Sequence, residues 1–539
     1  MTIKLLIAAI VIFACVLLSK ISGKLGIPML LSFILLGMLF GSDGIFRIPF
    51  DNYAFAEQIC SAALIFIMFY GGFGTNWNQA KSVAVKSILL STLGVIITAS
   101  LTGVFCHYVL NMEWTCSLLI GSLIGSTDAA SVFYILRSKK LNLKYNTASL
   151  LEVESGSNDP CAYMLTVTLI SIANGRAGGA QIGILIVEQI VFGLLFGFVI
   201  AAISVYVLRR IRFTTEGFDV IFVVGIALAS YALPQLVNGN GFLSVYIVGI
   251  VIGNIDINNK KSLVHFFDGI TGLMQMLLFF LLGLLSFPSM LPHVILPAVL
   301  ISLFLTLIAR PVAVAIVLAP FRSKLNQILL VSWAGLRGAA SIVFTTMVVV
   351  MTDIDYDIFH IVFLIVLFSI TIQGTLLPYF AEKLNMIDNN ADVMKTFNDY
   401  SEEVPVRFIQ LNIPSEHEWC EKKIKDIILP PESLIVLVKR GSESIIPNGE
   451  TILQEEDTLI LCATSPEIID DTSLTEICLD DDSRYTGKLI SEIPRRDNSL
   501  IIMIQRGDQV IIPNGGVRLE AGDVIVINRV KSLAAKKMA

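Results

Sequence analysis

The stretch from 148 to 173, ASLLEVESGSNDPCAYMLTVTLISIA, decides how the rest of the chain is interpreted. It is long and apolar enough to cross a bilayer, yet it contains Glu152, Glu154 and Asp159. A carboxylate at the bilayer centre costs about 3 kcal/mol on insertion scales, so intramembrane acids are rare and usually line an ion or proton pathway. A surface helix with scattered acids is the alternative, and the apolar flanks disfavour it. We therefore expect a membrane helix that takes part in transport.

Helical spacing places the polar residues of this stretch on two neighbouring faces. Glu152, Ser155 and Asp159 share one face, because they follow one another at three and four residues. Glu154 and Asn158 are four apart and share the adjacent face. Two adjacent polar faces indicate two separate roles for this helix.

Pro160 interrupts the backbone hydrogen bonding of the same helix. Proline has no N–H, so the carbonyl of Gly156 is left free, close to the Asp159 carboxylate and the Ser155 hydroxyl. Oxygen ligands of this kind can replace the hydration shell of a small cation. The sequence therefore predicts a cation site in the middle of the helix.

Composition places the chain among integral membrane proteins with an additional soluble part. Of its 539 residues, 55% are hydrophobic and 15% are charged. The net charge of −6 comes without a basic run, so nucleic acid is not an expected partner. The eight cysteines form no CxxC or Cys/His spacing, so we expect neither a zinc site nor a disulfide framework.

Thirteen apolar runs of bilayer-spanning length precede residue 386. They lie at 3–19, 27–41, 54–71, 84–110, 115–136, 148–173, 181–208, 218–236, 241–254, 265–286, 291–319, 327–350 and 356–381. The two runs that flank Asn238-Gly239-Asn240-Gly241 could form one span, which leaves twelve as an alternative. No small-residue cleavage pattern follows the first run, so we expect it to be a retained helix. The predicted fold is a polytopic α-helical membrane protein of about 13 transmembrane helices.

Basic residues in the loops orient these helices. With the N-terminus outside, the loops on the inner side hold most of the Lys and Arg, and only Lys4, Arg47 and Arg176 fall on the outer side. This asymmetry predicts an odd number of spans and a cytoplasmic C-terminus. Arg310 and Arg337 lie inside apolar runs and are the natural counter-charges for the buried acids.

The fifth run, GSLIGSTDAASVFYILR at 121–137, looks like a broken helix. Ser126, Thr127 and Asp128 are all good N-cap residues, so a second half-helix could begin at Ala129 in mid-membrane. Asp128 as a cap on an intact helix is the alternative. Broken helices whose ends face an ion site at the midplane are typical of secondary transporters.

The twelfth run, SWAGLRGAASIVFTT at 332–346, again combines glycines with a charge, Arg337. It predicts a second interrupted helix. Two such helices in corresponding halves of the chain are what inverted repeats would give.

The tail contains an internal duplication. Residues 434–462 and 500–528 align without gaps at an offset of 66, with seven identities between the ten residues from 440 to 449 and those from 506 to 515. Each copy has strand-like runs around a shared IIPNG bend, preceded by a helix-like segment at 416–427 or 486–492. We predict a transmembrane domain at 1–386, a linker at 387–403, and two cytoplasmic α+β modules at 404–464 and 465–539.

Three motifs in order, GSTDAASVF, ESGSNDP and WAGLRGAAS, resemble the NhaP-like branch of the first cation/proton antiporter family over about residues 1–385. The duplicated tail resembles the C-terminal RCK-type regulatory domain. The resemblance implies a homodimer in a bacterial cytoplasmic membrane. Each protomer would have thirteen helices, with a dimerisation domain and a mobile six-helix core in contact with lipid. It also implies antiport of K+ or Na+ against H+, a role in pH homeostasis, and no enzymatic activity.

The family motifs assign roles to individual residues. By motif position, Asp159 would bind the cation or the proton, with Asp128, Ser155 and the carbonyl of Thr127 as further ligands. The same resemblance implies a supporting scaffold around the site. Its members would be Glu154, Asn158, Arg337 and, as a looser match, Arg310, with Arg337 bridging helices and holding Asn158.

One residue departs from the family pattern. Many relatives have an acid in the third span just before a Gly-Gly pair, where this chain has Tyr70 in FYGGF. This puts a water-linked carboxylate from the third span in doubt. The preference between K+ and Na+ stays open with it, because both accept oxygen ligands.

A carboxylate that binds either a cation or a proton must exchange the two if its site opens to one side at a time. Asn158 cannot carry a second proton, so one-for-one electroneutral exchange is favoured, although Asp128 leaves the count open. A passive cation channel gated by the modules is the alternative, but no TVGYG-like pore loop is present. A receptor without ion flux is a third reading. We expect no cofactor, and the modules could bind a regulatory nucleotide or ion or serve only as dimer contacts.

Overall fold

A computed structural model describes most of the chain. The described residues are 2–25, 29–128, 131–132, 135–136, 139, 141–176, 178–210, 217–255, 260–388, 406–415, 417–429, 433–441, 443–464, 472–479, 483, 485–492, 499–506, 509–511 and 513–530. They belong to two compact units, Met1–Glu402 and Glu403–Ala539. Most of the predicted linker at 387–403 lies outside the described residues. The finer domain boundaries stay predictions.

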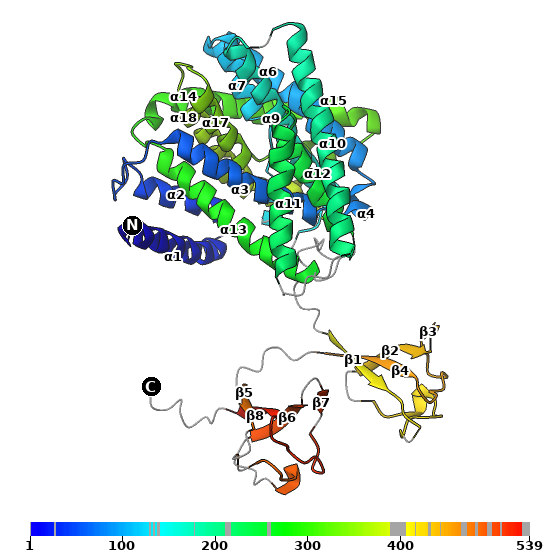
Figure 1. Cartoon of the computed structure of the whole chain (residues 1–539). Coiled ribbons are helices and arrows are strands. Elements are labelled where there is room, and N and C mark those ends of the chain that lie inside the picture. The colour runs from blue at the N-terminus through cyan, green and yellow to red at the C-terminus, as the bar shows by residue number, and fades with distance from the viewer. Residues whose placement is uncertain are drawn as a thin grey trace. The chain divides into compact units, whose positions relative to one another are not determined.

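The first unit is helical (Figure 1). Its helices are α1 (Thr2–Leu25), α2 (Met29–Phe40), α3 (Tyr53–Gly74), α4 (Trp77–Ala80), α5 (Ala84–Leu89), η1 (Leu90–Gly94), α6 (Val95–Leu110), α7 (Trp114–Leu123), α9 (Thr147–Ala173), α10 (Ala180–Arg210), α11 (Phe218–Gln235), α12 (Gly241–Gly253), α13 (Lys260–Leu285), α14 (Leu291–Phe304), η2 (Leu305–Ala309), α15 (Arg310–Leu318), η3 (Ala319–Phe321), α16 (Leu325–Trp333), α17 (Ala339–Met351), α18 (Ile358–Phe368), η4 (Ser369–Gln373) and α19 (Gly374–Lys383).

Each predicted apolar run overlaps at least one of these helices. By length and composition, 7 described helical segments are long and apolar enough to cross a membrane, and five shorter apolar helices accompany them. The helix α9, whose acids lower its hydropathy, is not among the 7. The prediction of a polytopic helical protein is confirmed, whereas the number of thirteen spans stays a prediction.

Polar and left-handed residues define where several helices begin and end. The Oδ1 atoms of Asn52 and Asn240 accept the backbone N–H of the third residue on, at the starts of α3 and α12. Asp357 caps α18 in the same way. Asn111 ends α6 in the left-handed conformation, with φ 53°. Short polar loops thus separate the apolar runs.

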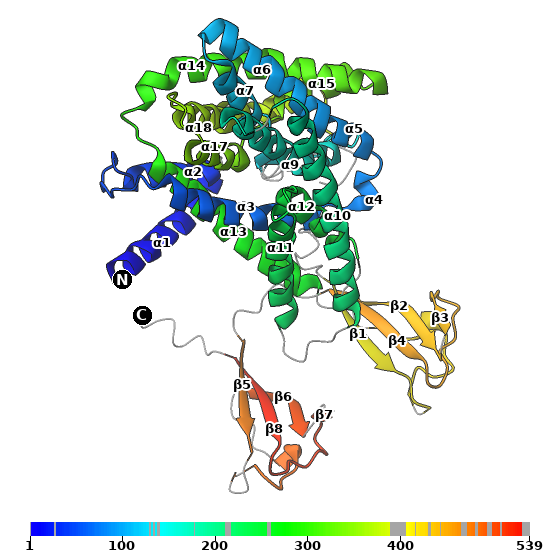
Figure 2. The ribbon, with the colours of Figure 1, turned by 45° about the horizontal axis from the view of Figure 1, so that its top comes forward.

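Glycines bring α3 and α12 into close contact, and α13 packs beside α3 (Figures 1 and 2). A Cβ atom added at Gly249 would lie 3.0 Å from the backbone nitrogen of Phe73, and one at Gly72 would lie 3.1 Å from that of Ile250. Small residues of this kind let helix backbones approach within a membrane. The two helices therefore form a closely packed pair.

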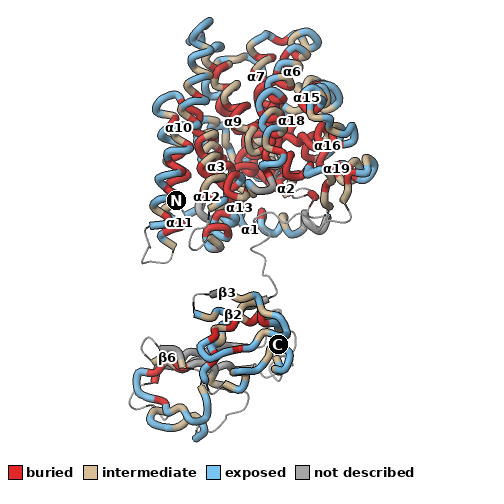
Figure 3. The backbone as a smooth tube through the Cα atoms, turned by 90° about the vertical axis from the view of Figure 1, so that its right-hand side faces the viewer, coloured by how far each residue is buried: buried red, intermediate tan, exposed pale blue. Residues whose placement is uncertain are grey.

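The helical unit is buried in its middle and exposed along its outer helices (Figure 3). On α10, the exposed side chains include Ile184, Val187, Val191, Leu195 and Phe198. A continuous apolar surface of this kind on a long helix fits contact with lipid rather than water.

The second unit contains two four-stranded antiparallel sheets (Figure 1). The first has the order β1-β4-β2-β3, built from Val406–Asn412, Thr458–Thr464, Ser433–Arg440 and Glu443–Ile445. The second has the order β5-β8-β6-β7, built from Thr472–Cys478, Val524–Val530, Ser499–Arg506 and Gln509–Ile511. The register of β2 against β4 shifts between Ile435 and Leu437, and that of β6 against β8 shifts between Ile501 and Met503. Both sheets thus repeat one pattern, as the duplicated sequence leads one to expect.

The helix-like segments predicted at 416–427 and 486–492 are wrong in detail. Their described residues form turns and two three-residue 3-10 helices, Ile424–Asp426 and Ile490–Glu492. The backbone N–H groups bond across to the loop after the IIPNG bend, as in Ile424 N to Thr451 O and Ile490 N to Val517 O, both 3.0 Å. Donors used in this way are lost to the i to i−4 bonds of an α-helix.

A buried aspartate binds an arginine at equivalent places in the two modules. Arg440 donates from Nε and Nη2 to Asp457 at 2.8 and 2.7 Å, and Arg506 donates likewise to Asp523 at 2.8 and 2.9 Å. The arginines lower the pKa of both carboxyl groups through these hydrogen bonds. Such two-point pairs fix the strand before the IIPNG bend to the loop after it.

We expect low pH to destabilise the first module, and the substitution Asp457→Asn to do the same. Because the folded pKa of Asp457 is lowered, its stabilising effect is present above the unfolded pKa of about 3.9 and is lost as the pH falls through the folded value. Hydrogen exchange of β2 and β4 peptides in the full-length protein, corrected for intrinsic rates, should therefore accelerate below about pH 4. The exposed Asp426→Asn is the control. Hydrogen exchange as slow in Asp457→Asn as in the wild type would contradict the prediction.

Candidate functional site

The helix that begins with α7 is interrupted at the motif predicted to break it. The helix α7 ends at Leu123, and residues 124–128 are not helical. Helical conformation returns at Ser131 and Val132. The predicted start of the second half at Ala129 lies outside the described residues. The break itself is confirmed.

A second break lies between α16 and α17. The helix α16 ends at Trp333 and α17 begins at Ala339, so 334–338 are not helical. The two breaks meet, because the backbone N–H of Asp128 donates to the carbonyl of Leu336 at 2.8 Å. Non-helical backbone at membrane depth is tolerated where protein surrounds it. The predicted second interrupted helix is thus confirmed.

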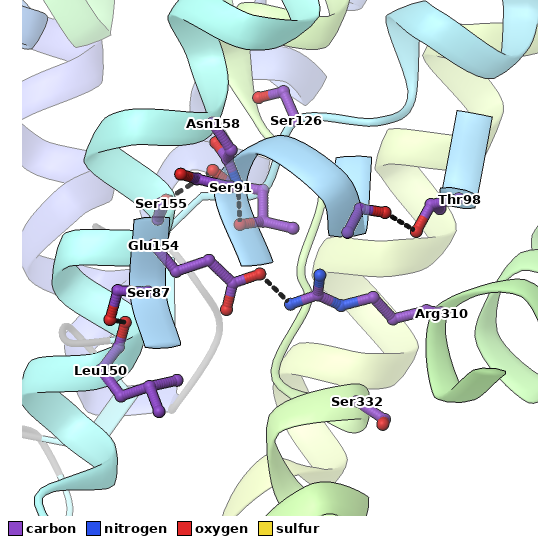
Figure 4. A network of polar contacts seen from close by, with 12 residues as sticks. Ser87, Ser91, Thr98, Ser126, Leu150, Glu154, Ser155, Asn158, Arg310 and Ser332 are labelled. Carbon is purple, nitrogen blue, oxygen red and sulfur yellow. Dashed lines mark hydrogen bonds and ion pairs between the residues drawn. The ribbon is translucent and has the colours of Figure 1, made fainter. Parts of the chain in front are cut away.

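The helix α9 supplies side chains to the first break. The Ser155 hydroxyl donates to the carbonyl of Thr127, and the Asn158 amide donates to the Thr127 hydroxyl, both at 2.5 Å. The Ser126 hydroxyl donates to the Asp159 carboxylate. Figure 4 shows Ser155 and Asn158 together on α9. Three residues predicted as ligands, Asp159, Ser155 and Thr127, therefore lie together.

Asp128 joins the same site from the other side of the break. Its Oδ2 accepts the Ser131 hydroxyl at 2.6 Å, which places it as a cap for the helical residues that follow. Gly338 leaves room for it, since a Cβ atom at that position would lie 2.6 Å from Oδ2. The fourth predicted ligand is thus at the point where the two breaks cross.

Arg337 bridges helices, although not through the predicted partner. Its Nη1 donates to the carbonyl of Ser126 at 2.7 Å, and its backbone N–H donates to the Ser369 hydroxyl at 2.9 Å. Among the described residues, Asn158 Oδ1 has no hydrogen-bond partner, so the expectation that Arg337 holds Asn158 is wrong. The Thr127 hydroxyl holds that amide instead, because the first break brings it next to α9.

Glu154 forms an ion pair with Arg310. Arg310 Nη2 lies 2.5 Å from Glu154 Oε1, and the two side chains are 3% and 1% exposed (Figure 4). Gly335, in the second break, packs against the guanidinium, since a Cβ atom there would lie 2.8 Å from Arg310 Nε. Arg310, which matches the family pattern only loosely, is therefore the arginine that neutralises Glu154 on the second polar face of α9.

Sequence reasoning missed three features of this region. Ser126, considered only as a cap, contacts Asp159. The Tyr70 hydroxyl donates to Asp268 of α13 at 3.1 Å, which links α3 to α13. Three π-helical segments, η1, η2 and η4, interrupt long helices next to the site. Such segments are frequent at functional sites. Each contains polar residues within an apolar run, such as Thr92, Thr306 and Ser369, but such residues also occur in regular helices.

The arrangement offers oxygen ligands without the pattern of a transition-metal site. Among the described side chains, no three His, Cys, Asp or Glu residues could share a metal ion. Asp159 and Asp128 lie beside unwound carbonyls and hydroxyls, which is a donor set for a weakly held monovalent cation. The same carboxylates can accept a proton.

Two family models match the chain. The model described as "Sodium/hydrogen exchanger, transmembrane" matches residues 8–383, and the TrkA-C domain matches 408–470 and 474–528. The K(+)/H(+) antiporter NhaP of Alkalimonas amylolytica is 31% identical over 472 residues, which cover 86% of this chain and 82% of that protein. The K(+)/H(+) antiporter NhaP2 of Shewanella sp. (strain MR-4) is 34% identical over 86% of this chain and 81% of its own length.

A solved structure supports the fold. The sodium proton antiporter MjNhaP1 from Methanocaldococcus jannaschii at pH 8 superposes with a TM-score of 0.63. The alignment covers 71% of this chain and 99% of that chain, at 22% identity. At this identity the likeness establishes the arrangement of the helices alone.

Proposed function

The chain belongs to the sodium/hydrogen exchanger family and is a cation/proton antiporter with TrkA-C domains, and we propose that Asp159 is the carboxylate at which the cation and the proton compete. The observation that carries this proposal is the meeting of α9 with the two helix breaks. It gives Asp159 a hydroxyl donor from Ser126 and places it beside Ser155 and Thr127. Asp128 lies at the same crossing.

Competition between the cation and the proton for one carboxylate explains how the two are exchanged. A single carboxylate is neutralised by a proton or by a cation, and an unpaired charge is too costly to carry through a membrane interior. If the site opens to one side at a time, each crossing carries one of the two ions. Asn158, the residue before Asp159, has no ionisable side chain and cannot transport a second proton. We therefore infer the exchange of one cation for one proton.

The other charges beside Asp159 form a support that holds the helices together. Glu154 is paired with Arg310, and Arg337 holds the carbonyl of Ser126. Because a buried charge without its partner is strongly unfavourable, neither arginine is expected to leave its position during transport. The charge that changes is then that of Asp159, with Asp128 as a further ligand.

Potassium is the proposed cation. The two curated relatives at 31% and 34% identity are named K(+)/H(+) antiporters, and they match the TrkA-C tail as well as the membrane part. The structural neighbour named as a sodium antiporter is less similar in sequence, at 22% identity. We therefore propose potassium as the better substrate and sodium as the weaker one.

The wider architecture is proposed on the family resemblance. The protein would be a homodimer in a bacterial cytoplasmic membrane, with its N-terminus outside and its tail in the cytoplasm, and would contribute to pH homeostasis. A mobile core would carry α9 past the dimerisation helices. The TrkA-C modules would bind a regulatory nucleotide or ion and bias that movement. An RCK-regulated passive channel is not favoured, because the matched family and relatives are exchangers.

The test is cation-driven proton movement in proteoliposomes with a preformed pH gradient. We expect potassium to collapse the gradient with saturation, sodium and lithium to do so more weakly, and choline to have no effect. Clamping the membrane potential should leave the rate unchanged, since the exchange is electroneutral. Potassium flux without proton movement would favour the channel and contradict the proposal.

A further inference from the structure

The turn Asn238-Gly239-Asn240-Gly241 joins α11 to α12 and is packed against its neighbours. Asn238 is left-handed, with φ 58°. A Cβ atom at Gly239 would lie 2.7 Å from the Phe192 Cβ of α10, and one at Gly241 would lie 2.6 Å from the carbonyl of Tyr231 in α11. Only glycine fits such approaches, so the position of the turn is fixed by α10 and α11.

Asn240 uses its polar groups to connect three helices. Its backbone N–H donates to Gln189 O of α10 at 3.1 Å, and its Oδ1 accepts the Leu243 N–H of α12 at 3.0 Å. Its Nδ2 donates to the carbonyl of Pro160 in α9 at 2.8 Å. Asn240 is 2% exposed, so water does not compete for these bonds. The last bond ends on the residue that follows Asp159.

The helix α12 also contacts α9 on the other side of Asp159. Tyr246 packs against Gly156, where a Cβ atom would lie 2.6 Å from two atoms of the tyrosine ring. Pro160 has no N–H to bond the Gly156 carbonyl, so the turn of α9 between these residues is held less firmly by its own backbone. Two contacts with α12 therefore enclose the turn that carries Asp159.

Amide side chains continue this connection along α9. Gln235 donates from Nε2 to the Tyr163 hydroxyl at 2.8 Å, and Gln189 donates from Nε2 to the Thr168 hydroxyl at 3.5 Å. These donors come from α11 and α10. The bond from Asn240 is the one next to the proposed ion-binding carboxylate.

We propose that Asn240 is a positioning residue for Asp159. Its amide fixes the carbonyl of Pro160, the residue after Asp159, relative to α12, and so sets how well the carboxylate meets a cation held by Ser155 and Thr127. The inference rests on the proposed role of Asp159 and goes beyond it, because Asn240 touches neither ion. If Asn240 positions Asp159, its substitution changes the affinity for the cation. If its role were purely structural, its substitution would change only the amount of active protein.

The experiment compares Asn240→Ser and Asn240→Asp with the same substitutions at Asn254, at the other end of α12. Serine and aspartate both cap helices, so the start of α12 is retained, but neither offers an N–H to Pro160. Asn254 is a matched control, since its Nδ2 donates to the carbonyl of Thr75, just after α3, at 2.8 Å and its Oδ1 accepts the N–H of Trp77, the first residue of α4. It ties the end of α12 to the residues that follow α3 and not to α9.

Potassium-dependent proton movement in proteoliposomes gives KM and the maximal rate separately. We expect both Asn240 variants to raise KM for potassium by roughly fivefold or more, as befits one lost hydrogen bond, and both Asn254 variants to change it less than twofold. KM does not depend on how much protein is folded, so partial destabilisation does not affect the comparison.

An unchanged KM in the Asn240 variants would overturn the inference, with or without a lower maximal rate. So would an equal rise in the Asn254 variants, which would trace the effect to α12 as a whole. Wild-type protein without potassium-dependent proton movement would refute the proposed function itself. An active wild type with an unchanged KM in the Asn240 variants would refute this inference alone.

Discussion

Asp159→Asn is expected to abolish exchange, with a loss of about a hundredfold or more, because an amide can neither release a proton nor neutralise a cation. Asparagine has nearly the same shape and can still accept the Ser126 hydroxyl at its carbonyl oxygen. The helix crossing should therefore stay assembled, and thermal unfolding in detergent should show a stable protein. Proton movement on addition of potassium to proteoliposomes is the measurement.

Asp268→Asn is the control for this substitution. Asp268 is an exposed carboxylate of α13 whose oxygen accepts the Tyr70 hydroxyl, a contact that asparagine can keep. We expect at least half of the wild-type rate. Residual saturable exchange in Asp159→Asn, or an equal loss in Asp268→Asn, would remove Asp159 from its proposed role.

The second large effect is expected from breaking the ion pair between Glu154 and Arg310. Both side chains are almost fully buried, and removing one partner of such a pair costs about 3–5 kcal/mol, because the other charge stays buried alone. Arg310→Met should therefore lower the unfolding temperature sharply, as should Glu154→Gln to a smaller degree. The double variant should recover much of the loss, since no uncompensated charge is left.

An exposed pair provides the comparison. Lys423 and Glu450 of the first module lie 2.8 Å apart but are 42% and 64% exposed, and pairs this exposed to water contribute little to stability. Glu450→Gln should therefore leave hydrogen exchange in the module almost unchanged. A double variant no more stable than Arg310→Met would show that the pair itself is not the source of the loss.

The helix breaks could be predicted because their signals are local. Ser126, Thr127 and Asp128 are cap residues within an apolar run, and Gly335 and Gly338 flank Arg337 in another. Each run therefore contains residues that end or start a helix at the observed place. The clustering of Asp159, Ser155 and Thr127 followed from helical spacing combined with the family motifs.

The choice of partners could not be predicted, because it depends on how distant segments cross. Glu154 bonds Arg310, 156 residues away, rather than Arg337. Helical spacing shows which face a side chain occupies but not which helix covers that face. The same limit explains why the link from Asn240 to Pro160, 80 residues apart, is visible only in the structure.

The error in the tail has a similar cause. The segments at 416–427 and 486–492 have helix-compatible residues, but the loop after each IIPNG bend offers carbonyl groups at the matching spacing. Backbone hydrogen bonds to that loop compete with helix formation, and these tertiary contacts outweigh the weak local helix propensity. The duplication itself was evident because it repeats residue by residue.

The central claim, that the cation and the proton compete at Asp159, is tested most directly by proton release from purified protein. A weakly buffered detergent solution is monitored with a pH dye while potassium chloride is added, with choline chloride as the salt control. We expect saturable release of about one proton per protomer in wild type, since cation binding displaces the proton from the carboxylate, and none in Asp159→Asn. Saturable potassium binding without proton release, or equal release from both proteins, would contradict it.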